Sequence, residues 1–186
     1  MKKYSVAAAM IALSMGSFAQ KANIKATDNA LYPPMNLAEA KKFIEPAMTN
    51  PETANLANTF NLAGKTYFLT YEEESKKAMT GGTPDMSVIK ENLVKATDAY
   101  LKAYDLDQKP NEKGKIKPAY TNEIKKKLTT LQGYLINEGN NCYTAQDYKG
   151  AVALWNKYTE IPDSPAMAGV AKDSIYNDIK FFAINA

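Results

Sequence analysis

The chain has 186 residues and a formal net charge of +3, and all of its 23 basic residues are lysine. It lacks arginine, the preferred bidentate partner of carboxylate and phosphate groups, and histidine, the usual general base and commonest metal ligand. A nearly neutral chain has no basic surface charge that would favour nucleic-acid binding. The absence of arginine and histidine makes an enzyme or a metal site less expected.

The first residues predict a secretory signal peptide over 1–19. Two lysines open the chain, and the apolar run 6–15 is far shorter than the roughly 20 residues that span a bilayer. Ser17 and Ala19 then place small residues at the positions that a signal peptidase reads. A buried N-terminal helix is the alternative. Cleavage of the signal peptide would remove its two lysines and take the net charge from +3 to +1.

The remainder predicts an all-α fold of about six helices, because no strand-like alternation occurs. Apolar spacing and the intervening Pro, Gly and cap residues place the helices at about 37–48, 51–77, 84–105, 120–144, 148–161 and from about 166 onward. Residues 20–36 form a lead-in without structure, since Pro33 and Pro34 block a helix there. The lysine-rich segment 107–118 is expected to be a solvated loop.

One short pattern of residues recurs three times along the chain. The copies are Ala40, Ile44 and Ala47; Ala96, Tyr100 and Ala103; and Ala151, Trp155 and Tyr158. Offsets of four and three keep each set on one helix face, where the alanine lets a neighbouring helix approach and the bulky residue fills the space beside it. Recurrence after 56 and then 55 residues (96 − 40 and 151 − 96) predicts a stacked helical repeat.

These helix pairs resemble tetratricopeptide repeats. The first half of that family's pattern is matched by Phe60, Ala63, Gly64 and Tyr67, and in part by Leu135, Gly139 and Cys142. The second half of the family's pattern is matched by the recurring pattern described above. The family repeats about every 34 residues, so the resemblance, over about 36–186, is to a degenerate and expanded array. A signal peptide joined to lysine-rich units of this kind is also similar to proteins exported to the Bacteroides-type cell envelope.

The resemblance implies a right-handed stack of antiparallel helical hairpins, an α-solenoid, over 37–186. It also implies a concave groove lined by the first helix of each hairpin, which binds a peptide or a partner subunit. Carried over to this sequence, the groove residues are Asn61, Lys65, Phe68, Ile136, Asn140 and Tyr143. The alternative is that these six are ordinary inter-helix or surface residues.

Few residues suggest chemistry. The run 72–74 holds three consecutive glutamates, which point in different directions on a helix and predict a solvated face. Asp105, Asp107 and Asp163 lack the further ligands of a calcium loop. Cys142 is expected to be a small buried hydrophobe, with an intermolecular disulfide or a nucleophile as alternatives. We therefore expect no catalytic residue, no metal site and no cofactor.

The expected function is an exported protein–protein interaction scaffold in the periplasm or cell envelope. Its partner is another protein or a peptide, with no nucleic acid and no integral membrane segment; a membrane-associated complex is left open. The first alternative is a carbohydrate- or small-ligand-binding envelope protein that uses some of the 12 tyrosines. The second is an enzyme that relies on Glu, Tyr and Lys.

The last residues, 181–186, are unusually apolar for the end of a helical array. They suggest a truncated chain, a surface that docks on a partner, or a last helix that folds back onto the fifth.

Overall fold

The computed structural model describes residues 21–111 and 113–185. The signal peptide predicted over 1–19 lies outside these residues. Within them there is no strand, and the predicted all-α fold is confirmed. After a helical segment at 21–30, the helices are α2 (Leu37–Thr49), α3 (Ala57–Met79), α4 (Met86–Asp107), α5 (Thr121–Thr144), α6 (Tyr148–Asp163) and α7 (Tyr176–Asn185), with a 3₁₀ turn η1 (Pro165–Met167) between the last two.

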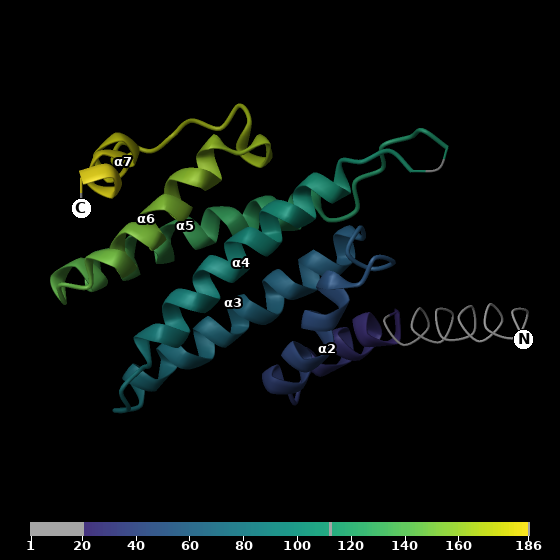
Figure 1. Ribbon diagram of the computed structural model, residues 1–186, viewed down its shortest axis with the longest axis horizontal. Coiled ribbons are helices and arrows are strands. Elements are labelled where there is room, and N and C mark those ends of the chain that lie inside the picture. Colours follow the sequence, from purple (N-terminus) through teal and green to yellow (C-terminus); the bar gives the residue numbers. More distant parts are fainter. Residues whose placement is uncertain (1–20, 112, 186) are drawn as a thin grey trace, which may run out of the picture.

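The helices follow one another across the molecule in chain order (Figure 1). Each contacts the next in sequence, and the pairs α3–α4 and α5–α6 pack most extensively. A further contact joins α4 to α6, where Lys90 pairs with Asp147 and Lys157 pairs with Asp98 at 2.5 Å. One continuous hydrophobic core runs through all of these helices. No helix in the described residues is both long and apolar enough to cross a bilayer.

The three copies of the recurring pattern lie in this core. All nine side chains are buried, and none is more than 3% exposed. Glycines of the preceding helices face two of the bulky residues. A Cβ placed on Gly64 of α3 would lie 2.8 Å from the Tyr100 ring of α4, and one on Gly139 of α5 would lie 2.5 Å from Nε1 of Trp155 of α6. Only a residue without a side chain allows these two helix pairs to pack so closely.

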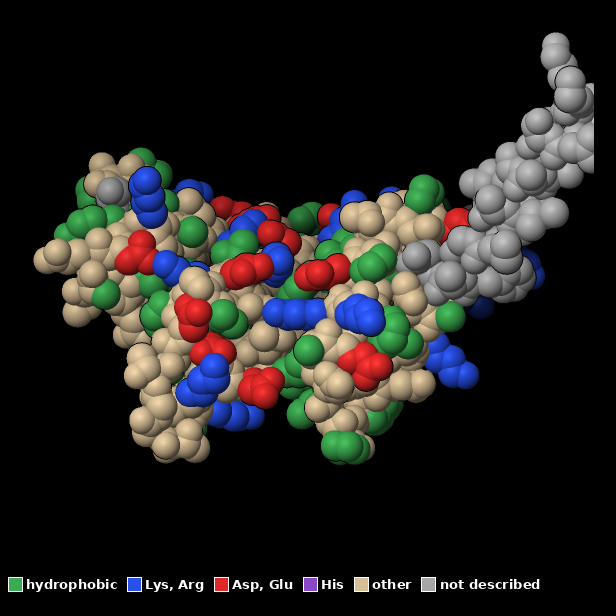
Figure 2. Space-filling view, turned by 60° about the horizontal axis from the view of Figure 1, so that its bottom comes forward, with side chains coloured by type: hydrophobic (Ala, Val, Ile, Leu, Met, Phe, Trp, Pro, Cys, Tyr) green, Lys and Arg blue, Asp and Glu red, His purple; other side chains and the backbone are tan. Residues whose placement is uncertain are grey.

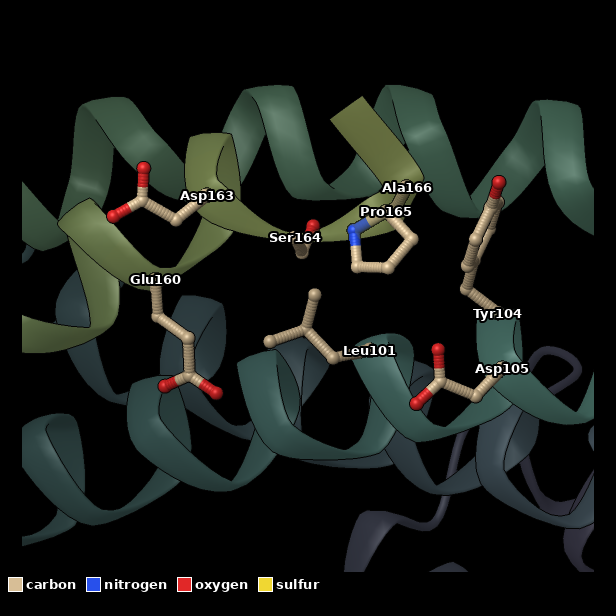
Figure 3. A pocket seen from close by; sticks show the side chains of 8 residues that line it. All are labelled: Leu101, Tyr104, Asp105, Glu160, Asp163, Ser164, Pro165 and Ala166. Carbon is tan, nitrogen blue, oxygen red and sulfur yellow. The ribbon is translucent and has the colours of Figure 1, made fainter. Parts of the chain in front are cut away.

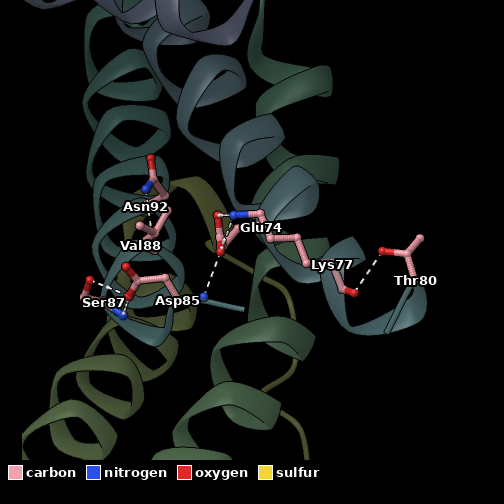
Figure 4. Close-up of polar contacts among 7 residues, drawn as sticks. All are labelled: Glu74, Lys77, Thr80, Asp85, Ser87, Val88 and Asn92. Carbon is pink, nitrogen blue, oxygen red and sulfur yellow. Dashed lines mark hydrogen bonds and ion pairs between the residues drawn. The ribbon is translucent and has the colours of Figure 1, made fainter. Parts of the chain in front are cut away.

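Several carboxylates fix the ends of the helices. Glu74 of α3 accepts a hydrogen bond of 2.7 Å from the N–H of Asp85, and this bond links α3 to the start of α4 (Figure 4). Glu74 also forms an ion pair with Lys77 of its own helix. These interactions hold the pKa of Glu74 below its usual range. The predicted solvated face is therefore wrong for Glu74, which is only 8% exposed, because the turn between the helices brings a backbone donor to it.

Asp107 performs a similar role for α5. Its carboxylate accepts hydrogen bonds from the N–H groups of Ala119 and Tyr120 and from the Thr121 hydroxyl, at 2.8–3.0 Å. Burial by itself would raise the pKa of Asp107, but these hydrogen bonds outweigh it and lower the pKa. The described residues of the lysine-rich loop that follows Asp107 are mostly exposed, as predicted, and the Asp107 carboxylate holds the far end of the loop through Ala119 and Tyr120.

Three local predictions need correction. Residues 21–30 of the lead-in are helical, with Thr27 and Leu31 buried; Pro33 and Pro34 follow this helix and do not prevent it. The second helix begins at Ala57 and not at 51, because residues 51–55 form a turn. The last helix begins at Tyr176 and not near 166, because the chain leaves η1 through Gly169 at φ +81°.

The glycine–aromatic contacts give a test of the packing. We expect Gly139→Ala to destabilise the protein by about 1–2 kcal/mol, since overpacking against a buried ring exceeds the gain in helix propensity. Gly133 lies in the same helix, and a Cβ placed on it would meet nothing within 4 Å, so Gly133→Ala should stabilise by about 0.5–1 kcal/mol. Urea unfolding of both variants measures the difference. Stabilisation of similar size by both would contradict close packing at Gly139.

Candidate binding groove

The six groove residues predicted from the sequence fall into two groups in the structure. Ile136, Asn140 and Tyr143 of α5 lie together and line one hollow. Asn61 and Phe68 of α3 are instead buried, at 6% and 4% exposure.

The surroundings of the α3 residues explain their burial. Phe68 packs against Tyr71 and Tyr134, with ring centroids 6.1 and 5.8 Å away, and the Lys127 ammonium lies 5.2 Å from its ring. These neighbours fill the space between α3 and α5. Lys65 is half-buried, with its ammonium 5.7 Å from the Tyr32 ring. The first three predicted residues therefore do not line an open groove.

The hollow on α5 continues to α7, and we call it the α5/α7 groove. Its volume is about 520 Å³, and Trp155 of α6 contributes to its wall. The lining residues are Ile136, Asn140, Tyr143, Trp155, Ile175, Asp178, Ile179 and Phe182. A smaller hollow of about 250 Å³ adjoins it through shared residues and is lined by Tyr143, Tyr148, Phe182 and Asn185.

Aromatic rings follow one another along this groove. Tyr148, Tyr143, Trp155 and Phe182 form a series with centroid distances of 5.3, 5.5 and 6.3 Å. Trp155 is only 3% exposed, whereas Tyr143, Tyr148 and Phe182 are 46–49% exposed. The half-exposed rings thus surround a buried one, which gives the groove apolar contact area that solvent reaches.

The first turn of α7 fixes this helix beside the groove. The Tyr176 hydroxyl donates a 2.6 Å hydrogen bond to Asp163 at the end of α6, and Lys172 and Lys180 both pair with Asp163. Tyr176 and Ile179 are buried, while Phe181, Phe182 and Ile184 are exposed. The last helix therefore folds back onto α6 along one side, and no described residue covers its other side.

Exposed apolar side chains are concentrated at this end of the molecule. Of the 13 large hydrophobic residues that are exposed in the described part of the chain, seven lie from Tyr143 onward. They are Tyr143, Tyr148, Val170, Ile175, Phe181, Phe182 and Ile184. Exposed apolar patches of this kind mark binding surfaces more often than single exposed hydrophobes do. Elsewhere, Figure 2 shows a face on which acidic and basic side chains are interspersed.

A second hollow, of about 270 Å³, lies between α4 and the end of α6 (Figure 3). Glu160 and Asp163 project from α6, and Asp105 projects from α4 on the opposite side. Glu160 pairs with Lys157, and hydrogen bonds from Lys172 and Tyr176 lower the pKa of Asp163 to about 2. No group of three carboxylate or thiol ligands able to hold a metal ion occurs in the described residues. Glu160 and Asp163 therefore act as partners in ion pairs.

Cys142 lies on the buried face of α5, which it shares with Leu135 and Gly139. Burial raises the pKa of its thiol, which disfavours the thiolate that a nucleophile requires. The expected small buried hydrophobe is the role that fits this environment.

Comparison of the chain with protein-family models, with curated proteins and with solved structures finds no match in any of the three.

The part of the groove contributed by α6 and α7 is not predicted from the sequence. The spacing of the residues places Trp155 in the core and Ile175, Ile179 and Phe182 on the apolar stripe of the last helix. The signal for the groove is present in that stripe. Which residues of that stripe remain exposed depends on where the helix packs, and spacing along the sequence does not report this.

Trp155 is the only tryptophan, so its fluorescence reports on this groove. Because Tyr143 and Phe182 both contact it, Tyr143→Ala and Phe182→Ala should each increase acrylamide quenching of Trp155. Each should lower stability by about 1 kcal/mol, the scale of a lost aromatic pair. Ile116→Ala, at an exposed position in the lysine-rich loop, is the control and should change neither quantity. Unchanged quenching in both groove variants would show that these rings do not cover Trp155 in solution.

Proposed function

We propose that this protein is an interaction module that binds a peptide or partner subunit in the α5/α7 groove. The observation that carries the proposal is the series of half-exposed aromatic rings around Trp155, in a hollow of about 520 Å³. Aromatic side chains supply large, rigid contact areas and are enriched at the energetic centres of interfaces. Asn140 adds an exposed amide that can hydrogen-bond to a peptide backbone.

We further propose that the helices form a right-handed stack of tetratricopeptide-like hairpins. Support comes from the same glycine–aromatic contact in both major pairs, Gly64 with Tyr100 and Gly139 with Trp155. In this arrangement α7 takes the place of the first helix of a third hairpin. The groove then lies between the first helices of two successive hairpins, where the family's concave surface is found.

Export to the periplasm or cell envelope is part of the proposal and rests on the sequence of residues 1–19. A role without catalysis is also proposed. It is supported by the absence of histidine and arginine from the sequence and by the engagement of Glu160 and Asp163, beside the second hollow, in ion pairs.

A random peptide library displayed on phage tests the function. We expect the purified protein to enrich a set of related peptides, which then alter Trp155 emission on titration. The double variant Tyr143→Ala/Phe182→Ala should bind these peptides at least about tenfold more weakly, as expected for loss of two aromatic anchors. Ile116→Ala should bind as wild type. Equal binding by the groove variant would place the peptide site elsewhere and refute the proposal.

A carbohydrate-binding function is the second candidate. Tyr143 and Tyr148 are both exposed, and their ring centroids lie 5.3 Å apart. Tyr143 lines the groove together with the polar side chains of Asn140 and Asp178. Planar rings next to hydrogen-bonding groups suit sugars as well as peptides. Titration of Trp155 emission with an oligosaccharide panel separates the candidates: saturable change with a sugar, and no enriched peptide, would favour this second function.

A further inference from the structure

We propose that the α5/α7 groove selects a peptide segment with a basic side chain, lysine or arginine, placed between its aromatic rings and Asp178. This inference deepens the proposed function and rests on it, because it names the chemistry of the segment that the groove binds.

The first observation concerns the five described aromatic rings that lysines cover and the groove rings that they do not. Seven contacts place a lysine ammonium within 6 Å of a ring centroid. The covered rings are Tyr32, Tyr67, Phe68, Tyr104 and Tyr176. Among the described residues, no lysine lies over Tyr143, Tyr148, Trp155 or Phe182. The groove therefore holds three half-exposed rings, those of Tyr143, Tyr148 and Phe182, that no lysine of the described chain covers.

The second observation concerns Asp178. It is the one charged side chain among the described residues that line the groove, and no lysine of the described chain forms an ion pair with it. The acids that do pair with lysine include Glu74, Glu91, Asp98, Asp147, Glu160 and Asp163. The nearby lysines of the same segment, Lys172 and Lys180, are engaged by Asp163. Within the described part of the chain, the groove thus has an uncompensated negative charge.

The two observations coincide in space. Asp178 and Phe182 are four residues apart on α7, so they lie on one helix face, and both line the groove. The Tyr143 and Phe182 rings are tilted by 36° and 44° to the Trp155 ring between them. A cation in the groove beside the half-exposed Tyr143 and Phe182 rings gains attraction from these rings and from the carboxylate together. An acidic side chain at the same place meets the repulsion of Asp178.

The shape of the site favours a segment of chain as the source of this cation. The groove continues past Tyr143 and Phe182 into the hollow lined by Tyr148 and Asn185. A basic residue beside Asp178 therefore leaves room for an apolar neighbour against Tyr148. Apolar contact and charge complementarity then come from adjacent residues of one peptide.

Charge reversal in the groove provides the test. Peptide selection is run in parallel on wild type, Asp178→Lys and Glu73→Lys, which makes the same charge change at an exposed site on α3. We expect lysine or arginine at a fixed position in the wild-type and Glu73→Lys pools, and its loss or replacement by an acid in the Asp178→Lys pool. Enriched peptides without a basic position would overturn this inference while leaving the peptide-binding function intact. Absence of any groove-dependent peptide would overturn both.

Titration then measures the charge contribution directly. A selected peptide and its arginine-to-citrulline analogue are compared on wild type and Asp178→Asn by Trp155 fluorescence. We expect the citrulline analogue to bind wild type roughly fivefold more weakly than the selected peptide, the scale of exposed ion-pair and cation–π contributions. On Asp178→Asn, the difference in affinity between the two peptides should be much smaller. Equal affinity of the two peptides for wild type would overturn the inference. Binding of tetramethylammonium alone, with no selected peptide, would assign the site to a small quaternary cation and would also overturn it.

Discussion

The close approach of a glycine in one helix to a large aromatic ring in the next determines how this protein packs. Gly64 lies against Tyr100 and Gly139 lies against Trp155, at distances that leave no room for a Cβ. Each ring occupies the space that a side chain on the facing helix would otherwise take. Tyr100 Oη and Trp155 Nε1 have no hydrogen-bond partner among the described residues, so these side chains contribute through shape and apolar area. The small buried residues Ala96 and Ala151, on the same helices, let neighbouring helices approach closely as well.

The two pairs keep this contact despite different lengths. Gly64 and Tyr100 are 36 residues apart, whereas Gly139 and Trp155 are 16 apart. The extra residues lengthen both helices of the first pair at the end where they are joined: α3 extends 15 residues beyond Gly64, and α4 begins 14 residues before Tyr100. In antiparallel helices, extension on both sides of the connecting turn leaves the contacts behind it in place. The turn at the extended end is then fixed by Glu74, which accepts the Asp85 N–H.

This geometry explains which parts of the structure could be predicted from the sequence. The helices from 37 to 161 follow local periodicity, and the burial of the recurring residues follows from their spacing, so these predictions hold apart from the start of α3. The helix at 21–30, the late start of α7 and the burial of Glu74 and Phe68 depend on contacts between distant segments, which periodicity does not report. For the groove, Ile136, Asn140 and Tyr143 were predicted through a resemblance, while Asp178 and Phe182 required knowledge of where α7 packs.

The position of α7 leaves a hollow beside the last aromatic side chains. Asp163 holds Tyr176, Lys172 and Lys180, which attaches the first turn of α7 to the end of α6. Between α3 and α5 the space is filled by Phe68, Tyr71 and Tyr134, whose ring centroids lie 5.0–6.1 Å apart. Between α5 and α7 the rings of Tyr143 and Phe182 contact Trp155 from its two neighbouring helices and leave a groove. The same type of aromatic contact therefore closes one interface and leaves the other open, because α7 is held mainly through α6.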